Sequence, residues 1–182
     1  MAKCKTHMQP RETRIRSITT WLLVALTIST SVISSAEEIS TAQAMADSIT
    51  VYPDGLGLPS GQGSAREGKV IYERVCAACH GSDGKSGINA ALVGGLGTLD
   101  SATPQRTVGS FWPYATTLFD YVRRAMPYNA PGSLSTDELY AITAYVLFMN
   151  TIVEADAVLD NKSLPLVTMP NAQGFRFTLK DP

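Results

Sequence analysis

The chain has 182 residues, a length that suits one domain or two small ones. It carries 15 basic and 16 acidic residues, and 45% of its residues are hydrophobic, as in an ordinary globular protein. This balance argues against nucleic acid as a partner, because nucleic-acid binding needs an excess of clustered Lys and Arg.

The N-terminal segment has the pattern of an export signal. Residues 1–16 carry five basic side chains against one acidic side chain, and a largely apolar run over residues 18–33 follows. The small residues Ser34 and Ala36 have the spacing of a cleavage site, so we expect residues 1–36 to be removed from a periplasmic protein. Cleavage after Ala46 and an uncleaved membrane anchor are the alternatives, although the run is short for a span. Only the anchored form would touch a membrane.

Cleavage after Ala36 leaves 10 basic and 15 acidic residues, a net charge of −5. Residues 37–63 are rich in Gly and Pro and show no sustained apolar period, which predicts a flexible, extended leader. Ser64 and Glu67 then form a capping box, in which each side chain accepts a hydrogen bond from a free amide of the first helical turn. We expect a helix over residues 64–77 and a domain over residues 64–150.

Two cysteines, Cys76 and Cys79, are followed directly by His80. A disulfide, a redox dithiol and a zinc site are alternatives for such a pair, but no other Cys or His follows residue 36 to complete a zinc site. Thiols one helical turn apart reach the two vinyl groups of a haem, and the adjacent imidazole falls beneath the iron. The pattern predicts one covalent haem c with His80 as its proximal ligand.

Methionine is the expected sixth ligand of the iron, because no second His remains after residue 36. Met126 is favoured, since it lies between a short helix predicted over residues 116–125 and Pro127, which ends that helix and turns the chain. Met149 is expected in the core, and Met169 lies in the tail. Met45 is the remaining candidate.

The other segments are assigned from turn residues and apolar periodicity. Residues 81–109 contain seven glycines and predict a loop against the porphyrin edge, with Leu92, Val93 and Leu96 lining the pocket. A second capping box at Ser135 begins a last helix that ends near Asn150. Residues 151–182 combine three prolines with large apolar side chains. They predict an extended tail that packs on its own domain or on a partner.

This order of helix, haem motif, loop, short helix, methionine loop and last helix resembles a class I cytochrome c. In that family a glycine eight residues before the first cysteine, here Gly68, lets the first and last helices cross closely. An aromatic residue four before it, here Tyr72, meets an aromatic residue of the last helix, here Tyr145. A glycine lacks the side chain that would hold two helix backbones apart. The resemblance implies an all-α fold wrapped around one haem.

Two longer stretches, TVGSFWPYATTLFDYVRRAMPYNAP (residues 107–131) and SLPLVTMPNAQGF (residues 163–175), resemble the SoxD-type cytochrome subunits of sulfane and sulfite dehydrogenases. The resemblance spans residues 64–176. It implies a single-electron acceptor for a molybdenum-containing, sulfite oxidase-like catalytic subunit, with a downstream cytochrome or oxidase as the next acceptor. Longer members carry two haems, so this chain corresponds to one cytochrome domain.

Three polar-tipped side chains, Arg106, Trp112 and Tyr114, are candidates for satisfying the haem propionates, with Trp112 first. The alternative is that Trp112 and Tyr114 are core aromatics. With both axial positions filled, the iron transfers electrons and has no open position for a substrate. A free-standing soluble cytochrome c and a haem-based sensor or peroxidase are the alternative functions.

Overall fold

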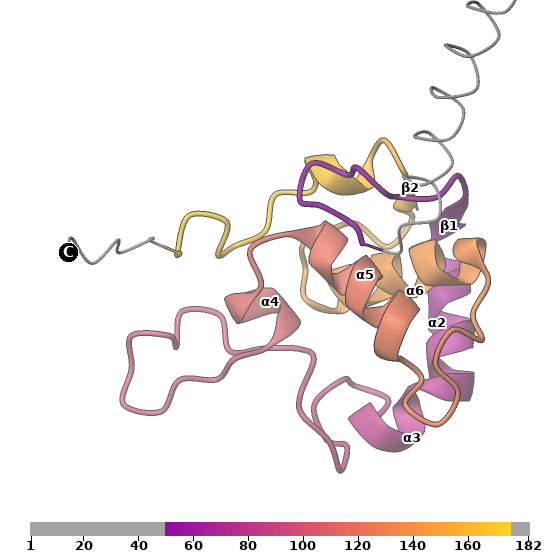
Figure 1. Cartoon of the computed structure of the whole chain (residues 1–182). Helices are drawn as coiled ribbons and strands as arrows, with labels where there is room; N and C mark the ends of the chain where they lie inside the picture. Colours follow the sequence, from indigo (N-terminus) through magenta and orange to yellow (C-terminus); the bar gives the residue numbers. More distant parts are fainter. Residues whose placement is uncertain (1–49, 176–182) are drawn as a thin grey trace, which may run out of the picture. The chain divides into compact units, whose positions relative to one another are not determined.

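The computed structural model describes residues 50–175 (Figure 1). The expected signal, residues 37–49 of the leader and residues 176–182 of the tail lie outside this range. The elements are β1 (Gln62–Ser64), α2 (Ala65–Val75), α3 (Ala77–His80), α4 (Val108–Phe111), α5 (Ala115–Ala125), α6 (Thr136–Met149), β2 (Val158–Asp160) and the 3-10 turn η1 (Leu164–Leu166). The described part is helical apart from one small sheet, as the sequence predicts. None of its helices has the length and apolarity needed to cross a membrane.

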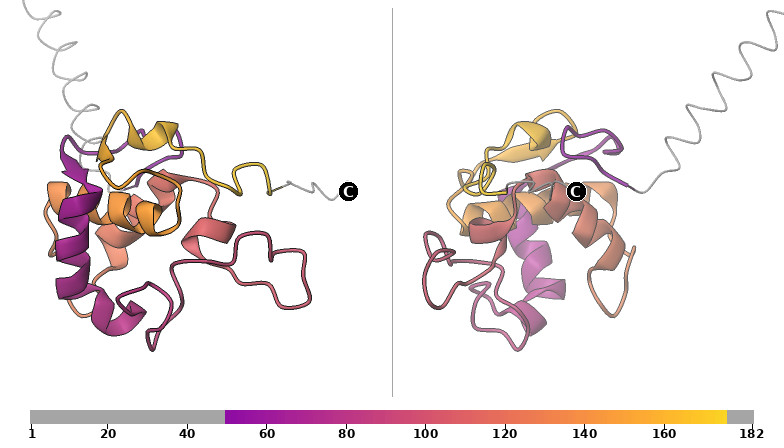
Figure 2. Two further views of the ribbon diagram at one scale, coloured as in Figure 1. Left: turned by 180° about the vertical axis from the view of Figure 1, so that it is seen from behind. Right: turned by 60° about the vertical axis from the view of Figure 1, so that its left-hand side comes forward.

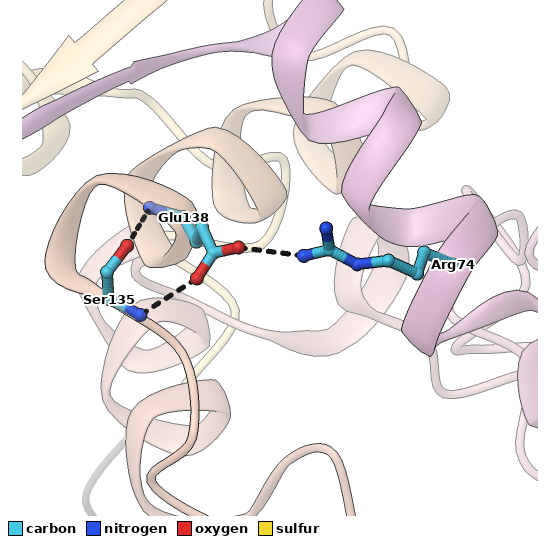
Figure 3. A network of polar contacts seen from close by, with 3 residues as sticks. All are labelled: Arg74, Ser135 and Glu138. Carbon is cyan, nitrogen blue, oxygen red and sulfur yellow. Dashed lines mark hydrogen bonds and ion pairs between the residues drawn. The ribbon is translucent and has the colours of Figure 1, made fainter.

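Both predicted capping boxes are present, at the N-termini of α2 and α6. At α2 the Ser64 hydroxyl accepts from the Glu67 amide at 3.2 Å, and the Glu67 carboxylate accepts from the Ser64 amide at 2.9 Å. At α6 Ser135 and Glu138 make the same exchange at 3.3 and 3.0 Å. The second Glu138 oxygen accepts from Arg74 at 2.8 Å, which ties the start of α6 to the last turn of α2 (Figure 3). The Ser135 amide and the Arg74 guanidinium hold the pKa of Glu138 below its usual value.

Helix α6 packs against both α2 and α5 and lies between them (Figure 1). The crossing with α2 is close at Gly68, where an added Cβ would lie 1.9 Å from the Ala141 carbonyl oxygen. Next to it the Tyr72 and Tyr145 rings meet edge to face, with their centroids 5.4 Å apart. The predicted roles of these residues in the helix crossing are therefore confirmed. Towards α5, the Tyr140 ring of α6 packs against the Phe119 ring, with their centroids 4.6 Å apart.

The described part of the leader differs from the flexible segment that the sequence predicts. Strand β1 pairs antiparallel with β2, with Gly63 opposite Leu159, and Val51 belongs to the hydrophobic core. The Tyr140 hydroxyl also donates to the Pro59 carbonyl at 2.8 Å. Backbone pairing with the tail holds this segment on the domain, so residues 50–63 are extended but packed.

The described tail packs mainly on its own domain. Leu164 and Met169 are 0% and 2% exposed, and both belong to the hydrophobic core. The leader and the tail run side by side (Figures 1 and 2), and Gly55 lies so close to Pro165 that an added Cβ would come within 2.4 Å of the proline ring. Leu166 and Phe175 face outward, at 80% and 48% exposed. The sequence left open whether the tail packs on its own domain or on a partner. Its most deeply buried side chains, Leu164 and Met169, pack on its own domain.

Candidate functional site

A cavity of about 900 Å³ opens among α2, α3, α5, α6 and the loops between them. This volume lies near the top of the range of roughly 300–1,000 Å³ that ligand pockets occupy. Its walls are largely apolar, with Leu118, Val122, Ile142 and Val146 among the lining residues. Six of the seven predicted site residues line it: Cys76, Cys79, His80, Arg106, Trp112 and Met126.

The two cysteines stand one helical turn apart at the junction of α2 and α3. The Cys76 carbonyl accepts from the Cys79 amide at 3.1 Å and from the His80 amide at 3.0 Å. Burial raises the pKa of the Cys76 thiol to about 11, so an unmodified Cys76 is protonated at neutral pH. Within residues 50–175 both thiols are free, and no three His, Cys, Asp or Glu side chains gather as a metal site. The described residues therefore offer no further ligands for the zinc alternative, and the two thiols have the one-turn spacing that thioether bonds to a haem need.

The orientation of the His80 ring is set by a backbone carbonyl. His80 Nδ1 lies 3.0 Å from the Ala90 carbonyl oxygen. Because a carbonyl can only accept, Nδ1 carries the proton and Nε2 keeps its lone pair for a metal. This partner was not predicted, since a carbonyl on an irregular loop leaves no trace in residue type.

The loop that carries Ala90 is held against the haem motif by backbone and phenol contacts. The Asn89 amide donates to the Cys79 carbonyl at 3.0 Å, and the Tyr72 hydroxyl donates to the Gly81 carbonyl at 2.9 Å. Burial raises the pKa of Tyr72 to about 12, so this phenol is a neutral donor at physiological pH. Gly87 permits the close approach, because an added Cβ would lie 2.2 Å from the Cys79 carbonyl oxygen.

Met126 is the one methionine among residues 50–175 that lines the cavity. It follows the last residue of α5 in extended conformation, and its amide donates to the Val122 carbonyl at 3.1 Å. Met149 packs against the hydrophobic core, as the sequence predicts, and Met169 is buried within that core. Met126 therefore lines the same cavity as His80 and the cysteines, and Met169 does not.

Tyr114 is the predicted site residue that lies outside the cavity. It precedes α5 as its N-cap and is 43% exposed. Tyr121 lines the cavity in its stead, and its ring packs edge to face with that of Trp112 at 5.6 Å. The i, i+3, i+4 spacing of Leu118, Tyr121 and Val122 on α5 is the signal that identifies this face.

The loop before α4 also differs from expectation. Leu92 lines the cavity as predicted. Val93 is buried but packs toward Gly84, and Leu96 is 67% exposed. The chain returns to the cavity at Arg106, two residues before the first residue of the short helix α4.

The donor set fits a haem c. Two thiols one turn apart can form the thioethers, an imidazole nitrogen with a free lone pair and a thioether sulfur can bind the iron, and apolar walls can enclose the macrocycle. Arg106 and Trp112 supply N–H donors for carboxylates.

Comparison with known proteins agrees with this assignment. The family model described as cytochrome C oxidase, cbb3-type, subunit III matches residues 63–146. A chain in the crystal structure of the sulfane dehydrogenase SoxCD from Paracoccus pantotrophus is 40% identical, with a TM-score of 0.70, over 75% of this chain and 68% of that chain. No curated protein sequence matches at a significant level.

Proposed function

Because the chain belongs to the SoxD-like class I cytochromes c, with a covalent haem c, we propose a specific place for it in electron transfer. It accepts single electrons as the cytochrome subunit of a periplasmic molybdenum enzyme that oxidises sulfur compounds or sulfite. It then passes them to a downstream cytochrome or oxidase. The observation that carries the proposal is the convergence of Cys76, Cys79, His80 and Met126 on one apolar cavity.

The haem supplies a one-electron couple, and the residues of this chain determine how that couple is held. Cys76 and Cys79 would attach the haem, and His80 and Met126, which come from different elements of the cavity wall, would bind its iron. The hydrogen bond from His80 Nδ1 to the Ala90 carbonyl fixes the ring and makes Nε2 the ligand. A methionine thioether favours reduced iron and raises the potential. With His80 and Met126 both bound to the iron, the site would exchange electrons and would not bind a substrate.

The cavity walls hold the remaining polar parts of the group. Arg106 and Trp112 line the cavity and would satisfy the propionates, whose charge would otherwise be buried without partners. The largely apolar walls would limit the water around the group, which disfavours the additional positive charge that the iron itself carries in the ferric state.

The similarity to the sulfane dehydrogenase SoxCD supports the proposed partner. The two chains are 40% identical over an alignment that covers 75% of this chain. From this similarity and from the SoxD-type stretches over residues 107–131 and 163–175, we infer that this chain serves a catalytic subunit that holds molybdenum, and that it acts as the electron outlet of the pair.

Replacement of the sixth ligand tests the site. We expect Met126→Ala to retain covalent haem, since attachment depends on Cys76 and Cys79, and to lose the sulfur-to-iron absorption band and bind carbon monoxide. Met149→Ala is the matched control, because Met149 packs in the core and does not line the cavity; it should keep the band. An unchanged band in Met126→Ala would contradict the proposed ligand.

Purification from the native host tests the partner. A tagged copy isolated at low salt should bring with it a molybdenum-containing protein in near-stoichiometric amount, measured by metal analysis. Sulfite, thiosulfate or sulfane sulfur should then reduce the haem in the isolated complex. If the chain elutes alone and accepts electrons equally from unrelated dehydrogenases, the free-standing soluble cytochrome is the correct assignment.

A further inference from the structure

The C-terminal segment, defined here as residues 169–175, returns to α4 beside the cavity wall. Beyond the buried Met169, the Asn171 side-chain amide donates a hydrogen bond to the Phe111 carbonyl at 2.7 Å. The rings of Phe175 and Phe111 meet edge to face, with their centroids 5.2 Å apart. Two side chains of this segment therefore contact one residue of α4.

Phe111 connects these contacts to the cavity. Helix α4 has four residues, so its last carbonyls have no partners within the helix. The Phe111 carbonyl shares a planar peptide unit with the Trp112 amide, so the hydrogen bond from Asn171 fixes the plane from which Trp112 extends. The Arg106 guanidinium lies 5.2 Å from the centroid of the Phe111 ring. Trp112 and Arg106 both line the cavity.

The position of the Asn171 side chain is itself built by a local turn. The Gly174 amide donates to the Asn171 carbonyl at 3.0 Å. An added Cβ at Gly174 would lie 1.8 Å from Asn171 Oδ1, so only glycine lets the chain pass this close to the side-chain amide. The amide is thus confined by its own segment while it donates to α4.

We propose that Asn171 and Phe175 are positioning residues for the haem cavity, which act through Phe111 to hold Trp112 and Arg106 in the cavity wall. This inference rests on the proposed site, in which Trp112 and Arg106 face the propionates. A cation and an indole held at that wall stabilise the more negative, reduced state of the bound group and keep water away from it. Release of the wall should therefore lower the midpoint potential.

The test uses the holoprotein with Asn171→Ala, and Leu166→Ala as the control, since Leu166 is in the same tail but is 80% exposed. Bound haem quenches indole emission at short range, and Trp112→Phe measured in parallel gives the background. We expect Asn171→Ala to increase Trp112 emission and to shift the midpoint potential downward. The sulfur-to-iron band should persist, and Leu166→Ala should match the unmodified protein.

Phe175→Leu provides a second variant that keeps apolar bulk while removing the ring contact, and we expect the same two changes from it. If both variants lower only the melting temperature, with emission and potential unchanged, the segment is structural and the inference is wrong. A missing sulfur-to-iron band in the unmodified protein would instead contradict the proposed Met126 ligation, so the two failures are distinguishable.

Discussion

Gly68→Ala perturbs the crossing of α2 and α6, on which the cavity is built. A Cβ at this position would lie 1.9 Å from the Ala141 carbonyl oxygen and 2.8 Å from the Tyr145 Cβ. The nearest neighbour is backbone, which cannot rotate away, so the helices must separate. Overpacking of this kind costs about 1–3 kcal/mol, and we place this case at the upper end. Alanine recovers about 1 kcal/mol through its higher helix propensity.

The net loss of unfolding free energy is therefore about 2 kcal/mol, which corresponds to a fall in melting temperature of about 6–12 °C for a domain of this size. Thermal unfolding of the holoprotein, followed by circular dichroism, measures it. Val70→Ala is the matched control, because Val70 lies on the same helix but is 65% exposed; its melting temperature should change little. A melting temperature of Gly68→Ala at or above that of the unmodified protein would refute the close-crossing argument.

Three further outcomes are expected. The Asp83 carboxylate accepts from the Lys85 and Ser86 amides, which lowers its pKa from 3.8 to about 2; its stabilising contribution is present above pH 4 and is lost as pH falls from about 4 to 2. Acid titration of Asp83→Asn should therefore show a shallower loss of stability in that window, and an unchanged slope would argue against it. Leu164→Ala should lower the unfolding free energy measured with denaturant by about 2–5 kcal/mol, because it leaves a cavity at a core position. A loss as small as that of a surface substitution would indicate that the tail packs on a partner and not on its own domain. Mass spectrometry of the native protein should give an N-terminus at Glu37, whereas a membrane-bound form that retains residues 17–36 would favour the anchor.

The sequence predicts those features that depend on local spacing. The capping boxes at Ser64 and Ser135 place both helix starts, because the hydrogen bonds involved span three residues. Gly68, Tyr72 and Tyr145 identify the helix crossing, since each lies at a fixed distance from the haem motif or along the last helix. Local pattern and the class I resemblance together were sufficient for this part of the fold.

Features that depend on long-range contacts were not predictable in this way. Strands β1 and β2 have three residues each, and one precedes α2 in the sequence while the other follows α6. Each is too short to show the alternation of apolar and polar residues that marks a strand. Every residue type has a backbone carbonyl, so residue 90 carries no sequence signal for its contact with His80. That contact depends only on the path of the loop. The spacing along α5 puts Tyr121 on one face with Leu118 and Val122, but only the packing of the helix shows that this face, and not Tyr114, meets the cavity.

A spectroelectrochemical titration of the purified holoprotein tests the central claim most directly, because it reports ligation and electron count together. The account predicts one reversible step of one electron per chain, with a low-spin ferric spectrum that includes the sulfur-to-iron band and no carbon monoxide binding at neutral pH. A high-spin ferric iron that reacts with peroxide, or a reduced form that binds carbon monoxide, in the unmodified protein would contradict it and would indicate a sensor or a peroxidase.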